Sequence, residues 1–195
     1  MLVINLFGVP GSGKSTGAAY IFSRLKMAGI NAELITEFAK DKVWEGNDTI
    51  FEPDNQLYLF GKQFYRMSRC RDKVDALVTD SPLPLCAFYN KSDTLGQGFN
   101  ILVWNVFNSF DNYNVLLERV KPYQEKGRLQ TEAESNAMLG PLTHCLDCGP
   151  IQYEKIPGDS IGYEKVIATA MHRMGKDPLP SLQQFWKDNC PFVQE

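Results

Sequence analysis

The sequence predicts an α/β domain built on a parallel β-sheet, and three observations favour this class. Residues 2–7 form a short apolar run that is typical of a buried parallel strand. A glycine-rich segment at 8–16 follows directly, and an amphipathic helical pattern at 17–26 comes next. Further along the chain, short apolar runs alternate with longer helical patterns. The length of 195 residues favours a single domain of this kind.

Composition and charge exclude several classes of protein. A hydrophobic content of 44% and an aromatic content of 12% exclude a disordered or low-complexity chain. The net charge of -3 argues against a protein that coats a polyanion, although it allows a local positive cleft. No segment reads as a signal peptide or a membrane span, and the five cysteines are expected to be reduced thiols. We therefore expect a cytoplasmic protein without a membrane partner.

The glycine-rich segment fits the phosphate-binding pattern G-x-x-x-x-G-K-[ST], known as a P-loop. Its glycines let successive backbone N–H groups point at phosphate oxygens, and the following helix adds a positive dipole end. Lys14 would contact the β- and γ-phosphates, and the Ser15 hydroxyl would ligate Mg²⁺. The segment therefore predicts a site for ATP with Mg²⁺. Its candidate nucleotide-binding residues are Gly8, Gly11, Ser12, Gly13, Lys14, Ser15 and Thr16.

Two carboxylates follow predicted strands. Glu37 comes after the run at 32–35, and Asp80 comes after the run at 74–79. Ligands of open α/β sheets bind beyond the carboxyl ends of the strands, so both side chains are expected near the phosphates. One would hold Mg²⁺, for which Asp80 is the candidate, and the other would orient or deprotonate an attacking hydroxyl. The sequence leaves open which of them is the base, and also allows a helix cap for Asp80 and a solvated acid for Glu37.

The residues after Asp80 favour transfer to an acceptor over hydrolysis. ATP-driven motors often place Asp-Glu at the end of this strand, with the Glu polarising water, whereas Ser81-Pro82 stands here. The chain is also short for a separate oligomerisation domain. Kinase chemistry is the better interpretation. A regulatory P-loop ATPase or switch without a phosphoryl acceptor is the alternative.

Over residues 1–170 the chain resembles the small P-loop nucleoside and nucleotide kinases. More narrowly, it is similar to kinase-like proteins of tailed phages that are related to the ribosylnicotinamide kinase domain. The resemblance implies a three-layer, kinase-type P-loop NTPase with a parallel five-stranded sheet and a helical lid. It implies ATP-dependent phosphorylation of a nucleoside-like acceptor, in the host cytoplasm if the protein is phage-encoded. The ordered motifs are Gly8–Thr16, Glu37-Phe38-Ala39-Lys40 with Trp44-Glu45, Phe60-Gly61-Lys62-Gln63 with Arg66, Thr79-Asp80-Ser81-Pro82, Arg119, Pro122-Tyr123, Gly127-Arg128 and Gln130-Thr131-Glu132.

Residues 54–72 predict a long helix on the acceptor side. Its expected core stripe is Leu57, Phe60, Phe64 and Met67. The helical spacing places Gln56, Gln63 and Arg66 together on an adjacent face. The resemblance implies that Gln63 and Arg66 bind the acceptor base, as glutamine and arginine can do chemically. The alternative is an ordinary solvated face.

A basic segment at 119–128 follows a predicted strand at 113–117, and a capping box at 131–134 begins a helix that is expected to reach 147. Such a loop suits a lid over the phosphates, here about residues 119–131. By the resemblance, Arg119 and Arg128 neutralise the charge of the transferred group. The alternative is an exposed basic loop.

The remaining expectations concern the organisation of the chain and its acceptor. We expect a kinase domain over 1–175, with a fifth strand at 151–156 and a last helix at 163–174, and a tail at 176–195 packed on the body. The acceptor is a small molecule, either a nucleoside or its monophosphate, or alternatively 5-hydroxymethyluracil in DNA. The acidic net charge disfavours DNA. The sequence leaves a monomer and a homodimer equally open.

Overall fold

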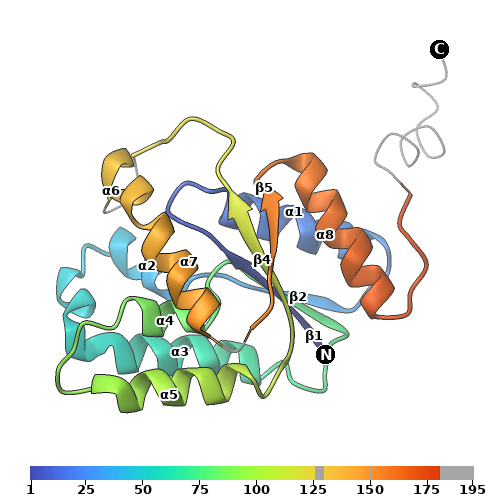
Figure 1. The fold of residues 1–195 in the computed structure, drawn as a ribbon. Coiled ribbons are helices and arrows are strands. Elements are labelled where there is room, and N and C mark those ends of the chain that lie inside the picture. Colours follow the sequence, from blue (N-terminus) through green and yellow to red (C-terminus); the bar gives the residue numbers. More distant parts are fainter. Residues whose placement is uncertain (126–129, 150, 181–195) are drawn as a thin grey trace.

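The computed structural model describes residues 1–125, 130–149 and 151–180. Its centre is a sheet of five parallel strands in the order β2-β3-β1-β4-β5, which confirms the predicted sheet (Figure 1). The strands are β1 (Leu2–Phe7), β2 (Ala32–Ile35), β3 (Ala76–Thr79), β4 (Asp111–Glu118) and β5 (Glu154–Pro157). Because all strands run the same way, their carboxyl ends meet at one edge of the sheet.

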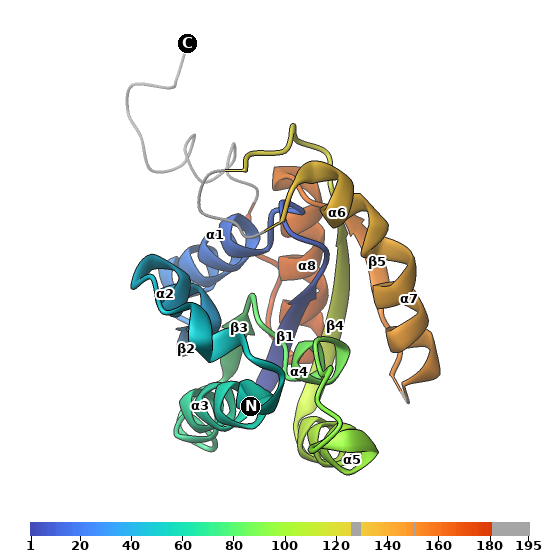
Figure 2. The same ribbon diagram turned by 90° about the vertical axis from the view of Figure 1, so that its left-hand side faces the viewer.

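Helices cover both faces of the sheet and complete three layers (Figures 1 and 2). One face packs against α1 and α8, and the other packs against α3, α4, α5 and α7. The helices are α1 (Lys14–Met27), α2 (Phe38–Trp44), α3 (Gln56–Ser68), α4 (Pro84–Phe88), α5 (Gly96–Phe107), α6 (Glu132–Ala137), α7 (Leu139–Cys148) and α8 (Ser160–Arg173), with short 3₁₀ turns at Asp48–Phe51 and Pro53–Asn55.

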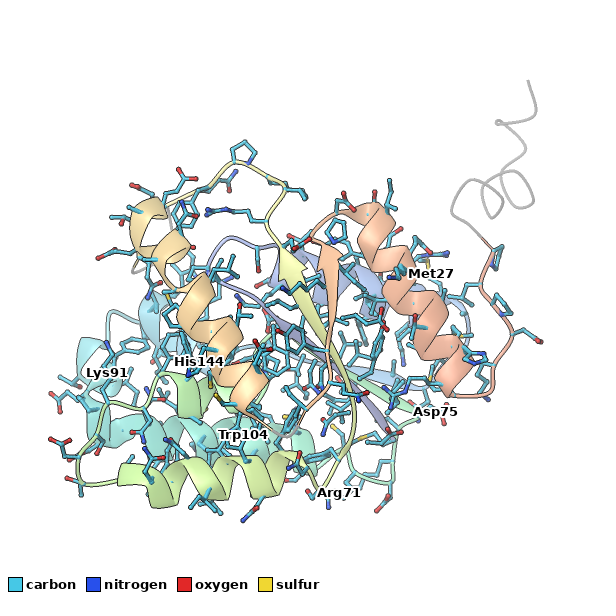
Figure 3. The ribbon with its side chains drawn as sticks, in the orientation of Figure 1. Met27, Arg71, Asp75, Lys91, Trp104 and His144 are labelled. Atoms are coloured by element: carbon cyan, nitrogen blue, oxygen red, sulfur yellow. The ribbon has the colours of Figure 1, made fainter. Side chains whose placement is uncertain are left out.

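The central strand β1 is buried along its whole length, as its apolar sequence predicts. Ile4 and Leu6 face the layer of α1 and α8, while Val3 and Phe7 face the layer of α3, α5 and α7. On that second side, Trp104 of α5 lies against the end of α7 at Gly149 (Figure 3). The strand is therefore held on both faces at the point where it runs into the P-loop.

The expected stripe of α3 is wrong in one respect. Leu57 is 49% exposed, and the buried residues of the helix include Gln56 and Gln63 beside Phe60 and Met67. Residues 56, 60, 63 and 67 are spaced three or four apart and form a stripe as regular as the predicted one. The two glutamines disguised this stripe because polar side chains are normally read as a solvated face. The helix is also shorter than predicted, since a 3₁₀ turn at Pro53–Asn55 precedes it.

The predicted helix after the lid is two helices. The capping box is confirmed, because Thr131 Oγ1 accepts from Glu134 N and Glu134 Oε2 accepts from Thr131 N. The chain then breaks at Met138, between α6 and α7. Further along, β5 begins at Glu154 rather than at 151. The last helix begins at Ser160 rather than at 163, because Asp159 Oδ1 accepts from Gly162 N at 2.9 Å and caps it.

The first residues of the tail touch the body. The Arg24 guanidinium is 4% exposed, binds Glu164 Oε1 at 2.9 Å and donates to the Pro180 carbonyl at 2.7 Å. The rest of the tail, 181–195, lies outside the described residues, so its packing remains a prediction. No helix in the described part of the chain combines the length and the apolar character that crossing a bilayer requires.

Substitution by alanine is expected to have opposite effects on stability at two helical glycines, Gly17 and Gly61. A Cβ on Gly17 in α1 would lie 2.6 Å from the Tyr163 ring, whereas a Cβ on Gly61 in α3 would meet nothing within 4 Å. We expect Gly17→Ala to lower the free energy of unfolding by about 1–3 kcal/mol through overpacking. Gly61→Ala should raise it by about 0.5–1 kcal/mol through helix propensity. Denaturant titration measures both, and a neutral Gly17→Ala would contradict the packing of α1 on α8.

Candidate active site

The P-loop is shaped by contacts from α8. Gly13 precedes α1 with a φ of 95°, in the left-handed region, and a Cβ on it would lie 2.5 Å from the Tyr163 hydroxyl. That hydroxyl shares its hydrogen between Gly158 O at 2.9 Å and Gly13 O at 3.1 Å. Only glycine satisfies both the backbone angle and the space. The glycine that the phosphate-binding pattern requires is therefore also required by packing.

The charged and hydroxyl groups of the loop lie at the start of α1. Lys14 Nζ donates to Gly8 O at 2.7 Å and to Val9 O at 3.1 Å, so the ammonium is folded over the loop. Ser15 and Thr16 are exposed in the first turn of the helix, where an anion and its cation are favoured. Ser12 Oγ is buried and has no hydrogen-bond partner within the described residues.

A cavity of about 510 Å³ extends from the P-loop toward α2, α3 and α4. Its volume falls in the usual range of small-molecule sites. The structure thus brings the predicted residues Lys14, Ser15, Thr16, Glu37 and Gln63 around one space. The other lining residues are Pro10, Gly11, Gly13, Phe38, Ala39, Lys40, Val43, Trp44, Phe51, Gln56, Leu59, Ser81, Leu85, Cys86, Tyr89, Lys91 and Gln130.

Glu37 is the carboxylate that faces this cavity. It follows β2 and precedes α2, as the sequence predicts. Burial raises the pKa of Glu37, and the positive charge of Lys14 works in the opposite direction. Burial and the nearby Glu37 charge raise the pKa of Cys86 to about 12 and raise that of Tyr89 as well. Glu37 therefore has neutral thiol and phenol neighbours at physiological pH.

Asp80 and Gln63 hold the backbone that presents Glu37. Asp80 Oδ1 accepts from Glu37 N at 3.0 Å, and Gln63 Oε1 accepts from Phe38 N at 3.2 Å. Gln63 Nε2 also donates to Thr79 Oγ1 at 3.4 Å, so its amide bonds within the protein at both ends. Both side chains are buried, and Asp80 does not line the cavity although Ser81 does. Sequence reasoning missed this anchoring role, because it depends on contacts between β3, α3 and the loop after β2.

Arg66 lies outside the cavity, apart from Gln63. Its guanidinium pairs with Asp41 Oδ2 at 3.0 Å and donates to Thr36 O at 3.3 Å. It also stacks over the Phe38 ring, 4.9 Å from the centroid. These contacts stabilise the outside of α2, so the arrangement does not group Arg66 with the acceptor side as the sequence suggests.

The segment after β4 and helix α6 both contact the P-loop. A Cβ on Gly11 would lie 2.7 Å from the Tyr123 ring, and Tyr123 donates to Gln130 O at 2.6 Å. Buried Ser135 of α6 donates to Pro10 O at 2.7 Å. The pairing of Pro122 with Tyr123 was a visible motif, but nothing in the sequence placed its ring on the loop.

Of the two lid arginines, Arg119 lies beside the P-loop. It pairs with Glu132 Oε1 at 3.7 Å, binds Asn136 and lies 5.1 Å from the centroid of the Tyr123 ring. Its Nη1 is buried without a hydrogen-bond partner in the described part of the chain. Arg128 belongs to 126–129 and lies outside the described residues.

Comparison with known proteins identifies the architecture. No family model and no curated protein matches the sequence. A solved deoxyadenosine kinase from M. mycoides with bound dATP matches with a TM-score of 0.53 over 89% of this chain and 100% of that chain. The fold is that of a P-loop kinase. At 17% identity this likeness shows the fold alone, so the chemistry has to be argued from the site.

The P-loop kinase fold implies a nucleotide and Mg²⁺, and the residues present fit both. The left-handed glycines, the Lys14 ammonium and the buried Arg119 Nη1, which has no hydrogen-bond partner among the described residues, suit a phosphate chain. Residues 1–125, 130–149 and 151–180 contain no cluster of three or more His, Cys, Asp or Glu side chains able to hold a metal. Mg²⁺ does not need one, since it binds through one or two protein oxygens together with the phosphates.

Two glutamines on the same face of α3 test the anchoring of Glu37. Gln63→Met would leave Phe38 N without its acceptor in a buried place, so we expect the free energy of unfolding to fall by about 1–3 kcal/mol. Gln56 makes no side-chain hydrogen bond within the described residues. Gln56→Met should therefore change the free energy of unfolding by less than about 1 kcal/mol. Denaturant titration compares the pair, and equal effects would contradict the anchoring role.

Proposed function

We propose that the protein transfers the γ-phosphate of Mg²⁺-ATP to a nucleoside- or nucleotide-type acceptor. The supporting observation is that Lys14 and Glu37 line one cavity, where burial raises the pKa of Glu37 and the positive charge of Lys14 opposes that rise. Lys14 would be the cation for the phosphates, and Glu37 would be the base for a hydroxyl bound in the same cavity. A regulatory switch would need no such carboxylate on the acceptor side.

The two carboxylates divide the work unequally in this proposal. Glu37 faces the cavity and would accept the proton of the attacking hydroxyl. Asp80 fixes the Glu37 backbone through Oδ1, which leaves its second oxygen available for a cation. Ser15 and Asp80 would hold Mg²⁺, which would neutralise charge on the phosphates.

Arg119 is the lid residue that we assign to the transferred group. Its Nη1 has no hydrogen-bond partner within the described residues, although it is buried. Leaving a guanidinium N–H unpaired in a buried place is unfavourable, and a phosphate oxygen would satisfy it. By the resemblance, Arg128 would act with Arg119.

The walls beyond Glu37 suit a nucleoside. Phe38, Trp44 and Phe51 offer aromatic contact area, and Trp44 is 67% exposed at the cavity. Gln56 and Tyr89 add hydrogen-bonding groups to the same walls. Aromatic side chains contact the faces of a base, while amides and hydroxyls bind its edge and the sugar.

Phosphate transfer tests the proposal directly. The protein is incubated with γ-labelled ATP, Mg²⁺ and either nucleosides, their monophosphates, ribosylnicotinamide or duplex DNA with 5-hydroxymethyluracil. We expect label on a small-molecule acceptor. Label found only as free phosphate would contradict the kinase assignment. Label on DNA would show that the acceptor is a base in DNA and not a small molecule.

The matched variants for this assay lie on one helix. Lys14→Ala should reduce transfer by at least about a hundredfold, because the phosphates lose a preorganised cation. Lys26→Ala removes an exposed lysine from the last turn of the same helix and should leave the rate unchanged. Equal transfer rates for Lys14→Ala and Lys26→Ala would contradict a role of the P-loop lysine in phosphate transfer.

The pH profile tests Glu37 as the base. A base must be ionised, so the rate should rise with pH through the raised pKa of Glu37, above the ordinary value of 4.5. Lys40 lowers this pKa, and Lys40→Met should move the acidic limb of the profile to higher pH. Lys42 pairs with Glu45 at 2.6 Å, so Lys42→Met is the control that should leave the limb in place. A limb that does not move in Lys40→Met would exclude Glu37 as the titrating base.

A further inference from the structure

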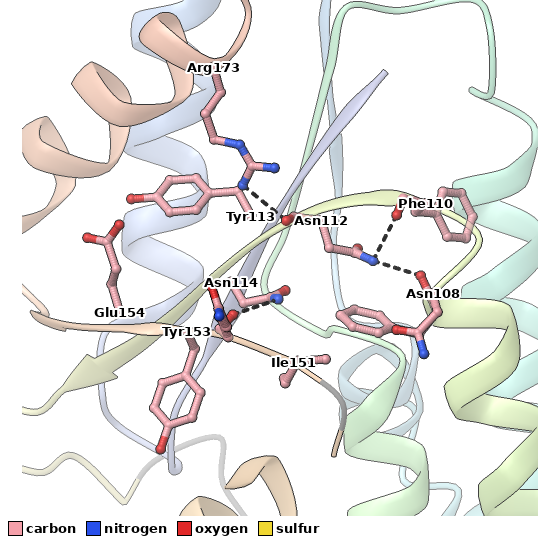
Figure 4. Close-up of a pocket in the computed structure, with 11 residues that line it drawn as sticks. Asn108, Phe110, Asn112, Tyr113, Asn114, Ile151, Tyr153, Glu154 and Arg173 are labelled. Carbon is pink, nitrogen blue, oxygen red and sulfur yellow. Dashed lines mark hydrogen bonds between the residues drawn. The ribbon is translucent and has the colours of Figure 1, made fainter.

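A second cavity, of about 560 Å³, lies at the opposite edge of the sheet (Figure 4). It is bounded by the end of α5, the first residues of β4, the segment 151–154 and Arg173 of α8. It shares no lining residue with the cavity at the P-loop. Any ligand bound there would therefore be separate from the site of phosphate transfer.

Two amides that line this cavity, those of Asn112 and Asn114, form a hydrogen-bonded cluster with buried Asn5 of β1. Asn5 of β1 donates from Nδ2 to Asn112 Oδ1 at 2.9 Å and to Asn114 Oδ1 at 3.0 Å. Asn112 Nδ2 in turn donates to Phe107 O at 2.7 Å, and Asn114 Nδ2 donates to Gln152 O at 3.1 Å. The sheet, the end of α5 and the segment before β5 are thus fixed to one another. Such preorganised walls are characteristic of binding sites.

The amide cluster is unfavourable for folding alone. Asn5 is fully buried between Val3 and Phe7, and its Oδ1 has no hydrogen-bond partner within the described residues. Burying an unsatisfied amide oxygen costs free energy that an apolar side chain would not. An aliphatic side chain of similar size at position 5 would fill the same space without that cost. Asn112 and Asn114 of this cluster line the cavity, so the cluster fixes the shape of its wall.

The charges around the cavity are already neutralised. Arg173 binds Asp111 Oδ1 at 2.8 Å and donates to Asn112 O at 3.0 Å. Glu154 pairs with Lys165 at 3.5 Å. The two ionic side chains of the wall each have a partner of opposite charge, so the cavity offers little attraction to an ion.

The groups left for a ligand are neutral. The side-chain amides of Asn108 and Gln152 are exposed at the wall and make no hydrogen bond within the described residues. Each can pair a donor and an acceptor with a base edge. Phe110 and Ile151 supply apolar surface beside them. We propose that this second cavity binds a neutral ligand with a nucleobase, either the free base or its nucleoside.

Side-chain amide resonances test the site on the full chain. Adenosine, guanosine, cytidine, thymidine, their free bases and their 5′-monophosphates are titrated without ATP, so phosphate transfer plays no part. We expect at least one base or nucleoside to shift the Asn108 and Gln152 amide signals. Its monophosphate should bind about tenfold or more weakly, because the one cationic side chain among the described residues of the wall, Arg173, is already paired with Asp111.

Variants on α5 locate the binding. Asn108→Leu, just after α5, should weaken it about tenfold through loss of amide hydrogen bonds, whereas Asn105→Leu, at an exposed position of α5 outside the cavity, should not change it. Gln152→Leu should act like Asn108→Leu. If no compound shifts either signal, if monophosphates bind as tightly, or if neither variant weakens binding, the proposal is wrong. If the ligand bound in the P-loop cavity and shifted these amide signals from a distance, Asn108→Leu would bind it as tightly as the unchanged protein does. That result would also contradict the proposal.

Discussion

The contact between Tyr163 and the P-loop is the constraint on which the rest of the site depends. The ring of Tyr163 fills the space beside Gly13 and Gly17, and its hydroxyl binds the carbonyls of Gly13 and Gly158. This one side chain joins α8, the P-loop and the first turn of α1. On its other side the loop is contacted by the Tyr123 ring and by the Ser135 hydroxyl of α6. A displaced loop would disturb all of these contacts together.

The second constraint is the burial of a carboxylate where a hydroxyl would be activated. Glu37 lies in an environment that raises its pKa, yet its backbone is held by Asp80 and Gln63 from two other elements. Such anchoring fixes the backbone from which the Glu37 side chain extends into the cavity. Asp80 and Gln63 thus stabilise the backbone at residues 37 and 38, a role that the polarity of their side chains alone does not predict.

The two edges of the parallel sheet have different chemistry. The carboxyl edge joins the P-loop cation with Glu37, while the amino edge contains the paired amides of Asn5, Asn112 and Asn114. Parallel sheets are buried on both faces, so polar groups inside them need partners or a purpose. The cavities at the two edges share no lining residue.

The sequence by itself determined the features that depend on neighbouring residues. The P-loop, the central strand, the placement of Glu37 after β2 and the capping box at Thr131 all follow from contiguous patterns. The tertiary structure decided the features that depend on distant partners. It turned Gln63 inward to Phe38 N, paired Arg66 with Asp41, and placed Glu37 but not Asp80 at the cavity. Helical periodicity offers several equally regular faces, and only packing against other elements selects the one that is buried.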